Sequence, residues 1–162
     1  MNLIKWDKVY SNNKKIDEIF IDRYKNDDEL FDKNCIELMV EVNEFVNETK
    51  VFKYWSVKTP NKEKMLEEYA DIITMILMFY REHNLEIKDE YPELSDNNKL
   101  NIIMEIYRKV YKFYQHNDSE ILEEIFYYTL YLGKLFEFTE DEIIEAINNK
   151  HKIIENRLNS DY

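Results

Sequence analysis

Apolar residues recur at helical spacing along most of this chain. Ile16, for example, is followed three and four positions later by Ile19 and Phe20, and side chains spaced in this way share one face of an α-helix. No stretch of useful length alternates apolar and polar residues as a half-buried strand does. The pattern predicts helices at residues 14–24, 33–50, 62–83, 99–115, 119–136 and 139–158.

Local signals mark the starts of three of these helices. Pro60 lies just before the third, where its restricted backbone angle is favourable. The hydroxyl of Ser119 can cap the fifth, and Thr139 and Glu142 have the spacing of a capping box at the start of the sixth. We therefore expect an all-α bundle of about six helices, formed by residues 1–162 as a single domain.

The apolar faces of the predicted helices indicate where the core lies. For the second and third helices we expect the interior to contain Met39, Val40, Val46, Ile72, Ile73 and Ile76. A second packed face is expected from Phe126, Tyr127, Leu130 and Tyr131. The histidines lie at segment ends or exposed positions in this interpretation, and we assign no role to His83, His116 and His151.

Composition agrees with a helical fold and narrows the function. The chain has only one Gly and two Pro, which is too few turn residues for a sheet protein with tight hairpins. Its net charge of −12 argues against nucleic-acid binding, since such proteins normally carry a basic surface. An acidic protein that acts on phosphate esters needs either metal ions or a local cluster of basic residues.

Three further features bear on location. Cys35 is the single cysteine, so no disulfide forms within the chain, as suits a reducing compartment. The N-terminus lacks the apolar region of a signal peptide. The longest apolar run, residues 72–80, is too short to span a bilayer. We expect a cytoplasmic protein that binds neither nucleic acid nor a membrane.

Acidic residues form a stripe along the second predicted helix. Its members are Glu37, Glu41, Glu44 and Glu48, which fall within about 60° of the helix circumference. Like charges at this spacing destabilise a helix, and no Lys or Arg lies between residues 37 and 48 to relieve them. A divalent cation would do so, because hard cations prefer carboxylate oxygens.

The third predicted helix carries a second acidic pair, Glu68 and Asp71, three residues apart on one face. The residues that follow Asp71 are apolar on nearly every side, so this carboxylate lies at the edge of a buried segment and needs a partner. All-oxygen ligands favour Mg²⁺ or Mn²⁺ over zinc or iron. Two solvated acidic faces without a metal remain the alternative interpretation.

The acidic residues together resemble the signature of a known enzyme superfamily. Glu41-x-x-Glu44 followed by Glu68-x-x-Asp71 is similar to the motif of the all-α nucleoside triphosphate pyrophosphatases, which include MazG-like enzymes and dimeric dUTPases. Over roughly residues 13–162, the chain resembles the dimeric dUTPases of Gram-positive bacteria and their phages. The segments that carry this likeness are residues 44–56, with Phe52-Lys53-Tyr54-Trp55, residues 132–146 and residues 150–162.

The resemblance implies hydrolysis of dUTP to dUMP and pyrophosphate by a homodimer, and leaves dUDP open as a second substrate. In the family, acidic residues hold magnesium ions on the phosphates and position the attacking water. Matched to this sequence, the metal ligands are Glu41, Glu44, Glu68 and Asp71. Glu48 either joins them or orients the water, so Glu44 and Glu48 are the candidate catalytic residues.

The resemblance also implies a set of substrate-binding residues. Asn47 can donate to and accept from the uracil edge, and Trp55 offers a flat apolar wall. The candidate phosphate contacts are Lys53, Lys150, Arg157 and Tyr162. Surface or packing roles remain open for Asn47, Trp55 and Lys150.

One position departs from the family pattern. The family usually carries a Gln in the first helix that contacts uracil, followed four residues later by Asp. Here the aligned residues are Asn13 and Asp17, and Asn is shorter by one methylene. Two alternatives therefore stay open beside dUTP hydrolysis: a pyrophosphatase for another nucleoside triphosphate such as dCTP, and a regulatory protein that binds a repressor on the same scaffold.

Overall fold

The structure, a computed structural model, describes residues 3–159, apart from the side chains of residues 3, 4, 20–23, 158 and 159. This part of the chain contains six α-helices and no strand, which confirms the all-α prediction. None of the described helices combines the length and apolar character that a membrane span needs. The helices are α1 (Leu3–Tyr24), α2 (Leu30–Thr49), α3 (Lys62–Glu82), α4 (Lys99–His116), α5 (Ser119–Leu135) and α6 (Glu140–Asn159).

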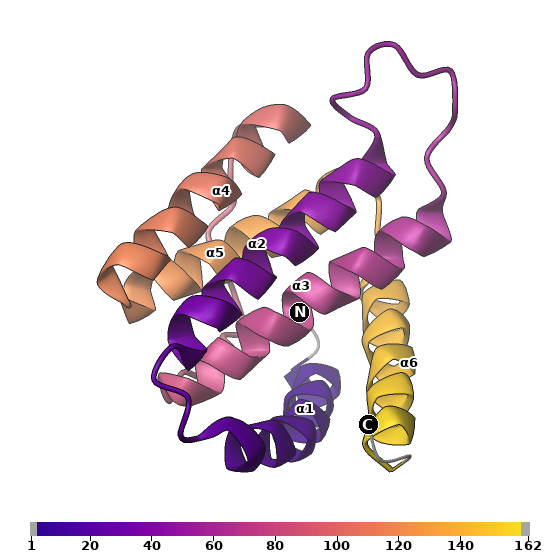
Figure 1. The fold of residues 1–162 in the computed structure, drawn as a ribbon. Coiled ribbons are helices and arrows are strands. Elements are labelled where there is room, and N and C mark those ends of the chain that lie inside the picture. Colours follow the sequence, from indigo (N-terminus) through magenta and orange to yellow (C-terminus); the bar gives the residue numbers. More distant parts are fainter. Residues whose placement is uncertain (1–2, 160–162) are drawn as a thin grey trace.

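Helix α3 is the centre of the bundle. It packs against α1, α2, α5 and α6, while α4 packs on α5 and α2. Figure 1 shows α2 and α3 side by side and antiparallel, with α4 and α5 beside and behind α2, α1 below α3, and α6 on the right. Because α3 is surrounded by other helices, its apolar residues occur on nearly every side, and Ile72, Ile73 and Ile76 are buried as expected.

The predicted start of the first helix was wrong. Helix α1 begins at Leu3 rather than at residue 14. Positions 6, 9, 13 and 16 form one buried stripe, but the residue at position 13 is an asparagine, which interrupts the apolar pattern that the sequence offers. Helix α2 likewise begins at Leu30, three residues before the predicted boundary at residue 33.

The helix starts show one confirmed cap and one corrected cap. Thr139 and Glu142 form the predicted capping box: the Thr139 backbone N–H donates to Glu142 Oε2 at 2.8 Å, and the Glu142 N–H donates to Thr139 Oγ1 at 3.2 Å. At α5 the cap is Asp118 and not Ser119, because the Asp118 side chain accepts from the Glu120 N–H at 2.8 Å. An ionised oxygen at this position also interacts favourably with the helix dipole.

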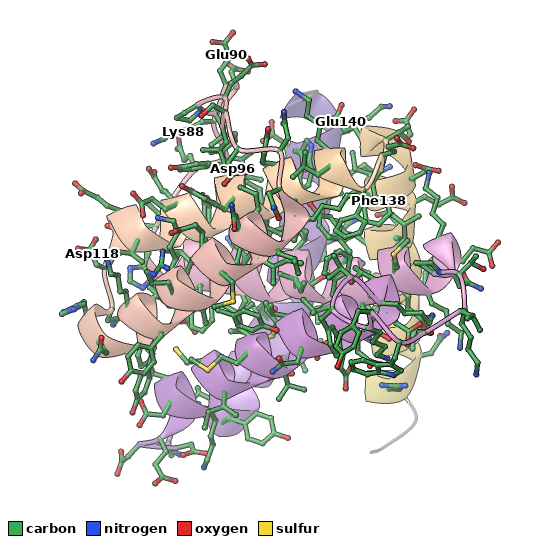
Figure 2. The ribbon with its side chains drawn as sticks, turned by 90° about the horizontal axis from the view of Figure 1, so that it is seen from above. Lys88, Glu90, Asp96, Asp118, Phe138 and Glu140 are labelled. Carbon is green, nitrogen blue, oxygen red and sulfur yellow. The ribbon has the colours of Figure 1, made fainter. Side chains whose placement is uncertain are left out.

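The single glycine allows α5 to approach α3 closely. A Cβ at Gly133 would lie 2.6 Å from the Tyr69 hydroxyl, which donates to the Thr129 carbonyl at 2.7 Å. Phe138, just beyond α5, packs edge-on against the Tyr69 ring, with their centroids 5.4 Å apart. Figure 2 places Phe138 and Glu140 where α5 gives way to α6. The contacts of Tyr69 with Thr129 and Phe138 hold the part of α3 that carries its acidic residues.

The predicted core on α2 was only partly right. Met39 and Val46 are partly buried against the core, but Val40 is 45% exposed. Val40 lies on a face of α2 that no described helix covers, and sequence spacing does not show which helical faces find a neighbour. In α5, Phe126 is buried, whereas Leu130 and its tyrosine neighbours are partly buried.

Candidate metal and nucleotide site

The antiparallel pairing of α2 and α3 brings three acids together. Glu41 and Glu44 lie one helical turn apart on α2, and Glu68 faces them from α3. Each offers a carboxylate oxygen, and these three oxygens lie within 4.8 Å of one another. We call Glu41, Glu44 and Glu68 the acid cluster. Three of the four predicted metal ligands are thus brought together, from two helices separated by a long loop.

The acid cluster is poorly neutralised. Burial, together with the neighbouring carboxylates of Asp71 and Glu44, raises the pKa of Glu41 to about 7. Burial also raises the pKa of Glu68, again with help from its acidic neighbours. Glu41 Oε2 is buried and has no hydrogen-bond partner among the described residues. This orphaned oxygen and the all-carboxylate donors fit a hard divalent cation such as Mg²⁺.

Asp71, the fourth predicted ligand, lies beside the acid cluster and is held by a lysine. Its Oδ2 accepts from Lys150 Nζ at 2.6 Å, across the contact between α3 and α6. Burial raises the pKa of Asp71, while the hydrogen bond and charge of Lys150 lower it. In this structure Lys150 forms an ion pair with Asp71, and its assignment as a phosphate contact stays a prediction.

A cleft of about 560 Å³ opens beside the acid cluster. This volume is in the range of pockets that hold small organic ligands. Four of the predicted site residues line it. Glu44 and Glu48 are metal or catalytic candidates on α2, Glu68 is a metal candidate on α3, and Asn47 is a base-binding candidate. The full lining is Val40, Asn43, Glu44, Asn47, Glu48 and Glu68.

The loop between α2 and α3 extends beyond the bundle (Figure 1). Its aromatic side chains Phe52, Tyr54 and Trp55 are exposed. Trp55 is 63% exposed and makes edge contacts with Phe52 and Tyr54, at centroid distances of 6.1 and 5.0 Å. Lys53 Nζ donates to Asn47 Oδ1 at 2.6 Å, which ties the loop to the cleft. Within one chain Trp55 is therefore not a core residue, and its ring is available to another molecule.

Asn13 is fully buried, and the bundle uses its hydrogen bonds. Its Nδ2 donates to Asp17 Oδ2 at 3.0 Å and, more weakly, to the Thr74 carbonyl at 3.4 Å. Its Oδ1 accepts from His151 Nε2 at 2.8 Å. Because this oxygen only accepts, the bond requires the His151 tautomer that is protonated on Nε2. Asp17 also forms a buried ion pair with Arg81.

The structure corrects the interpretation of His151. This side chain was expected at an exposed or terminal position, but it is only 4% exposed. Its partner Asn13 lies 138 residues earlier in the chain, so no local pattern could reveal the contact. The neighbouring residue Lys150 contacts Asp71, so two adjacent residues of α6 reach α3 and α1.

Two of the predicted phosphate contacts lie near the C-terminus. Arg157 is exposed in the last turn of α6. Tyr162 lies outside the described residues. Their assignment as substrate contacts stays a prediction, as does that of the remaining site residues.

Comparison with known proteins agrees with this arrangement of acids on an all-α bundle. The model of a family described as dUTPase matches residues 5–162, which is nearly the whole chain. The comparison with curated proteins found no match. With a family model that covers both acidic helices and the aromatic loop between them, the chain belongs to the all-α dimeric dUTPase family.

Proposed function

We propose that this protein hydrolyses dUTP to dUMP and pyrophosphate in a magnesium-dependent reaction. The observation that carries the proposal is the acid cluster, with its three carboxylate oxygens within 4.8 Å of one another, in a chain of the dUTPase family. The open cleft beside the cluster supplies room for a nucleotide. The cytoplasmic location and the single-domain organisation of residues 1–162 stay predictions.

The residues divide into two groups around the cleft. Glu41, Glu44, Glu68 and Asp71 would hold Mg²⁺, or Mn²⁺ in its place. The bound ion supplies positive charge to the oxygens of the phosphate chain. Glu48 lines the cleft on the same face of α2, outside the group of three close carboxylates. In this proposal it would orient the attacking water and accept its proton.

The aromatic loop and the end of α2 would bind the substrate. Asn47 has an amide that can pair with the uracil edge, and its bond to Lys53 holds its orientation. Trp55 would stack on the base. Lys53 and Lys150 would contact phosphates as point charges, and Arg157 and Tyr162 would join them from the C-terminal end of the chain.

The test is pyrophosphate release from dUTP, dCTP, dTTP and UTP, in Mg²⁺ and in EDTA. We expect release from dUTP alone, and only in Mg²⁺. Glu44→Gln should lower the rate by at least about a thousandfold while the fold is kept. A neutral ligand binds the metal more weakly and holds its positive charge less well at the phosphates. The matched control is Glu145→Gln on an exposed position of α6. Wild-type rates for Glu44→Gln would remove the assignment of the metal site.

A second substrate is favoured by one observation. Asn13 replaces the longer Gln of the family pattern, and its side chain is occupied by Asp17 and His151. A base pocket that lacks this contact would discriminate uracil from cytosine less strictly, since selection of a base depends on paired polar groups. Magnesium-dependent cleavage of dCTP at a rate similar to that of dUTP would support this alternative. A complete lack of hydrolysis would favour the regulatory, repressor-binding role.

We also propose that the protein is a homodimer through one face of α2 and α4, which lie side by side in Figure 1. On α4 the exposed apolar residues and half-buried Tyr107 recur at intervals of four and three residues in turn. This spacing is typical of the contact face between two packed helices. Exposed acidic residues of α2 and exposed basic residues of α4 flank the patch. In a dimer with a twofold axis, α2 of one subunit can therefore face α4 of the other. The patch contains Ile36, Val40, Leu100, Met104, Tyr111 and Tyr114.

Sedimentation equilibrium tests the dimer. We expect the wild-type chain to sediment at twice its mass of 20.0 kDa. Met104→Glu places a charge in the centre of the patch and should give a monomer, whereas Glu145→Gln should remain dimeric. A dimeric Met104→Glu variant would place the interface elsewhere.

A further inference from the structure

The ion pair between Lys150 and Asp71 joins the acidic helix α3 to the last helix of the chain. Lys150 Nζ lies 2.6 Å from Asp71 Oδ2; the Asp71 side chain is buried and the Lys150 side chain is partly buried. Asp71 itself lies among acids, since its charge acts on Glu37, Glu41 and Glu68. A single ammonium group is thus held at the edge of the acid cluster.

The positive charge of Lys150 reaches beyond its direct partner. It acts on Glu37, Glu41 and Glu68 in the direction that favours their ionised forms. Lys150 therefore supplies, in part, the neutralising charge that a divalent cation would supply in full. One positive charge cannot balance the three carboxylates of the cluster and Asp71 together.

The helix that carries Lys150 is anchored on both sides of it. Ile147 and His151 are buried, and His151 is hydrogen-bonded to Asn13 of α1. The backbone of α6 at Lys150 is therefore fixed against the bundle, while its side chain is a long flexible chain with a terminal ammonium group. A movement of this group away from Asp71 requires only rotation of side-chain bonds.

We propose that Lys150 is an internal counter-ion that holds Asp71 in the metal-free protein and leaves it when a divalent cation binds. Lys150 then turns its ammonium group towards the phosphates of the bound nucleotide. This inference rests on the proposed function, because it uses the same acids as metal ligands. The competing interpretation is a permanent ion pair that only stabilises the contact between α3 and α6.

Metal affinity in the absence of nucleotide distinguishes the two. In the wild-type protein a cation that binds Asp71 must displace Lys150, and Lys150→Met removes this competitor. We expect Lys150→Met to bind Mg²⁺ roughly tenfold more tightly, because a hydrogen bond to a charged group no longer has to be broken. The measurement is calorimetric titration with Mg²⁺ alone, at constant ionic strength.

The chain offers a matched control for the loss of one positive charge. Lys62 on α3 pairs with Glu142 on α6, with Nζ 2.7 Å from Oε1, so it joins the same two helices away from the acid cluster. Lys62→Met should change the Mg²⁺ affinity by less than about twofold, as expected for an exposed pair. Lys150→Arg keeps the charge and should retain the wild-type affinity.

Nucleotide binding gives a second readout of opposite sign. In saturating Mg²⁺, Lys150→Met should bind the α,β-imido analogue of dUTP roughly tenfold more weakly, since the phosphates lose a cation. Tighter Mg²⁺ binding together with weaker analogue binding supports the exchange. Unchanged or weaker Mg²⁺ binding by folded Lys150→Met overturns it. If that variant does not fold in EDTA, Lys150→Gln is titrated instead, and the same two outcomes decide.

Failure of this inference can be told apart from failure of the proposed function. If the wild-type protein hydrolyses dUTP in Mg²⁺ while Lys150→Met and wild type bind Mg²⁺ equally, only the exchange is wrong. If neither protein binds Mg²⁺, with or without the analogue, the exchange and the metal-dependent function are both wrong.

Discussion

Replacing Glu41 by glutamine should stabilise the metal-free protein at alkaline pH. The folded state holds Glu41 among other acids with one buried, unpartnered oxygen, and burial raises its pKa from 4.5 to about 7. Below pH 4.5 the carboxyl is protonated in both the folded and the unfolded state. Between pH 4.5 and about 7 the unfolded state has lost this proton while the folded state still holds it, so stability falls across this window and stays low above it.

The size of the effect follows from the pKa difference. A shift from 4.5 to about 7 corresponds to about 3 kcal/mol at most, at 1.36 kcal/mol per unit. The side chain is only partly buried, so screening reduces this to about 2 kcal/mol. In EDTA at pH 8, Glu41→Gln should therefore unfold at higher urea concentration than the wild type. Its midpoint of thermal unfolding should rise by about 4–8 °C for a chain of this size.

The assay is urea unfolding of both proteins from pH 5 to pH 8, in EDTA and in Mg²⁺. Histidine and the other buried acids titrate in both proteins, so the difference between them reports Glu41. At pH 5, near the start of this window, the difference should be only a small fraction of its value at pH 8. Mg²⁺ should stabilise the wild type by mass action and leave Glu41→Gln almost unchanged. A Glu41→Gln variant less stable than the wild type in EDTA at pH 8 would refute the reasoning. The exposed control Glu145→Gln should match the wild type both in EDTA and in its stabilisation by Mg²⁺.

Two further substitutions test the fold and the loop. Gly133→Ala should cost about 1–3 kcal/mol in urea unfolding, because its Cβ would lie 2.6 Å from the hydroxyl of the buried Tyr69; an equal stability in both proteins would show that α5 can move. Trp55→Ala should leave stability within about 0.5 kcal/mol, since the ring is 63% exposed. It should raise KM for dUTP by roughly tenfold with little change in kcat, as expected for loss of base stacking; an unchanged KM would remove Trp55 from the base site.

The sequence alone was enough to predict which acidic residues share a face of each helix. In an α-helix residues three and four positions apart share a face, so Glu41 and Glu44 had to point the same way once the helix was recognised. The capping box at Thr139 was predictable for the same reason, because its bonds join residues three positions apart. The family resemblance then ranked metal binding above two solvated acidic faces, which spacing alone left open.

The cap of α5 and the start of α1 were missed for two different reasons. Asp118 and Ser119 are both good capping residues, and spacing does not choose between adjacent candidates. The apolar stripe of α1 contains Asn13, whose burial is stable only because Asp17 and His151 satisfy its amide. In the sequence, a polar residue at a core position interrupts the apolar pattern that predicts a helix, and only its hydrogen-bond partners explain its burial.

Helix geometry encoded in the sequence determined the six-helix class, the acidic stripes and most of the buried face of α3. Tertiary structure alone decided which of these stripes meet. Glu68 joins Glu41 and Glu44 because α2 and α3 pack antiparallel, and Lys150 reaches Asp71 across 79 residues. Val40 stays exposed because none of the described helices covers it. The physical reason is that spacing along a helix sets which side chains share a face, whereas the pairing of faces depends on the burial summed over all helices at once.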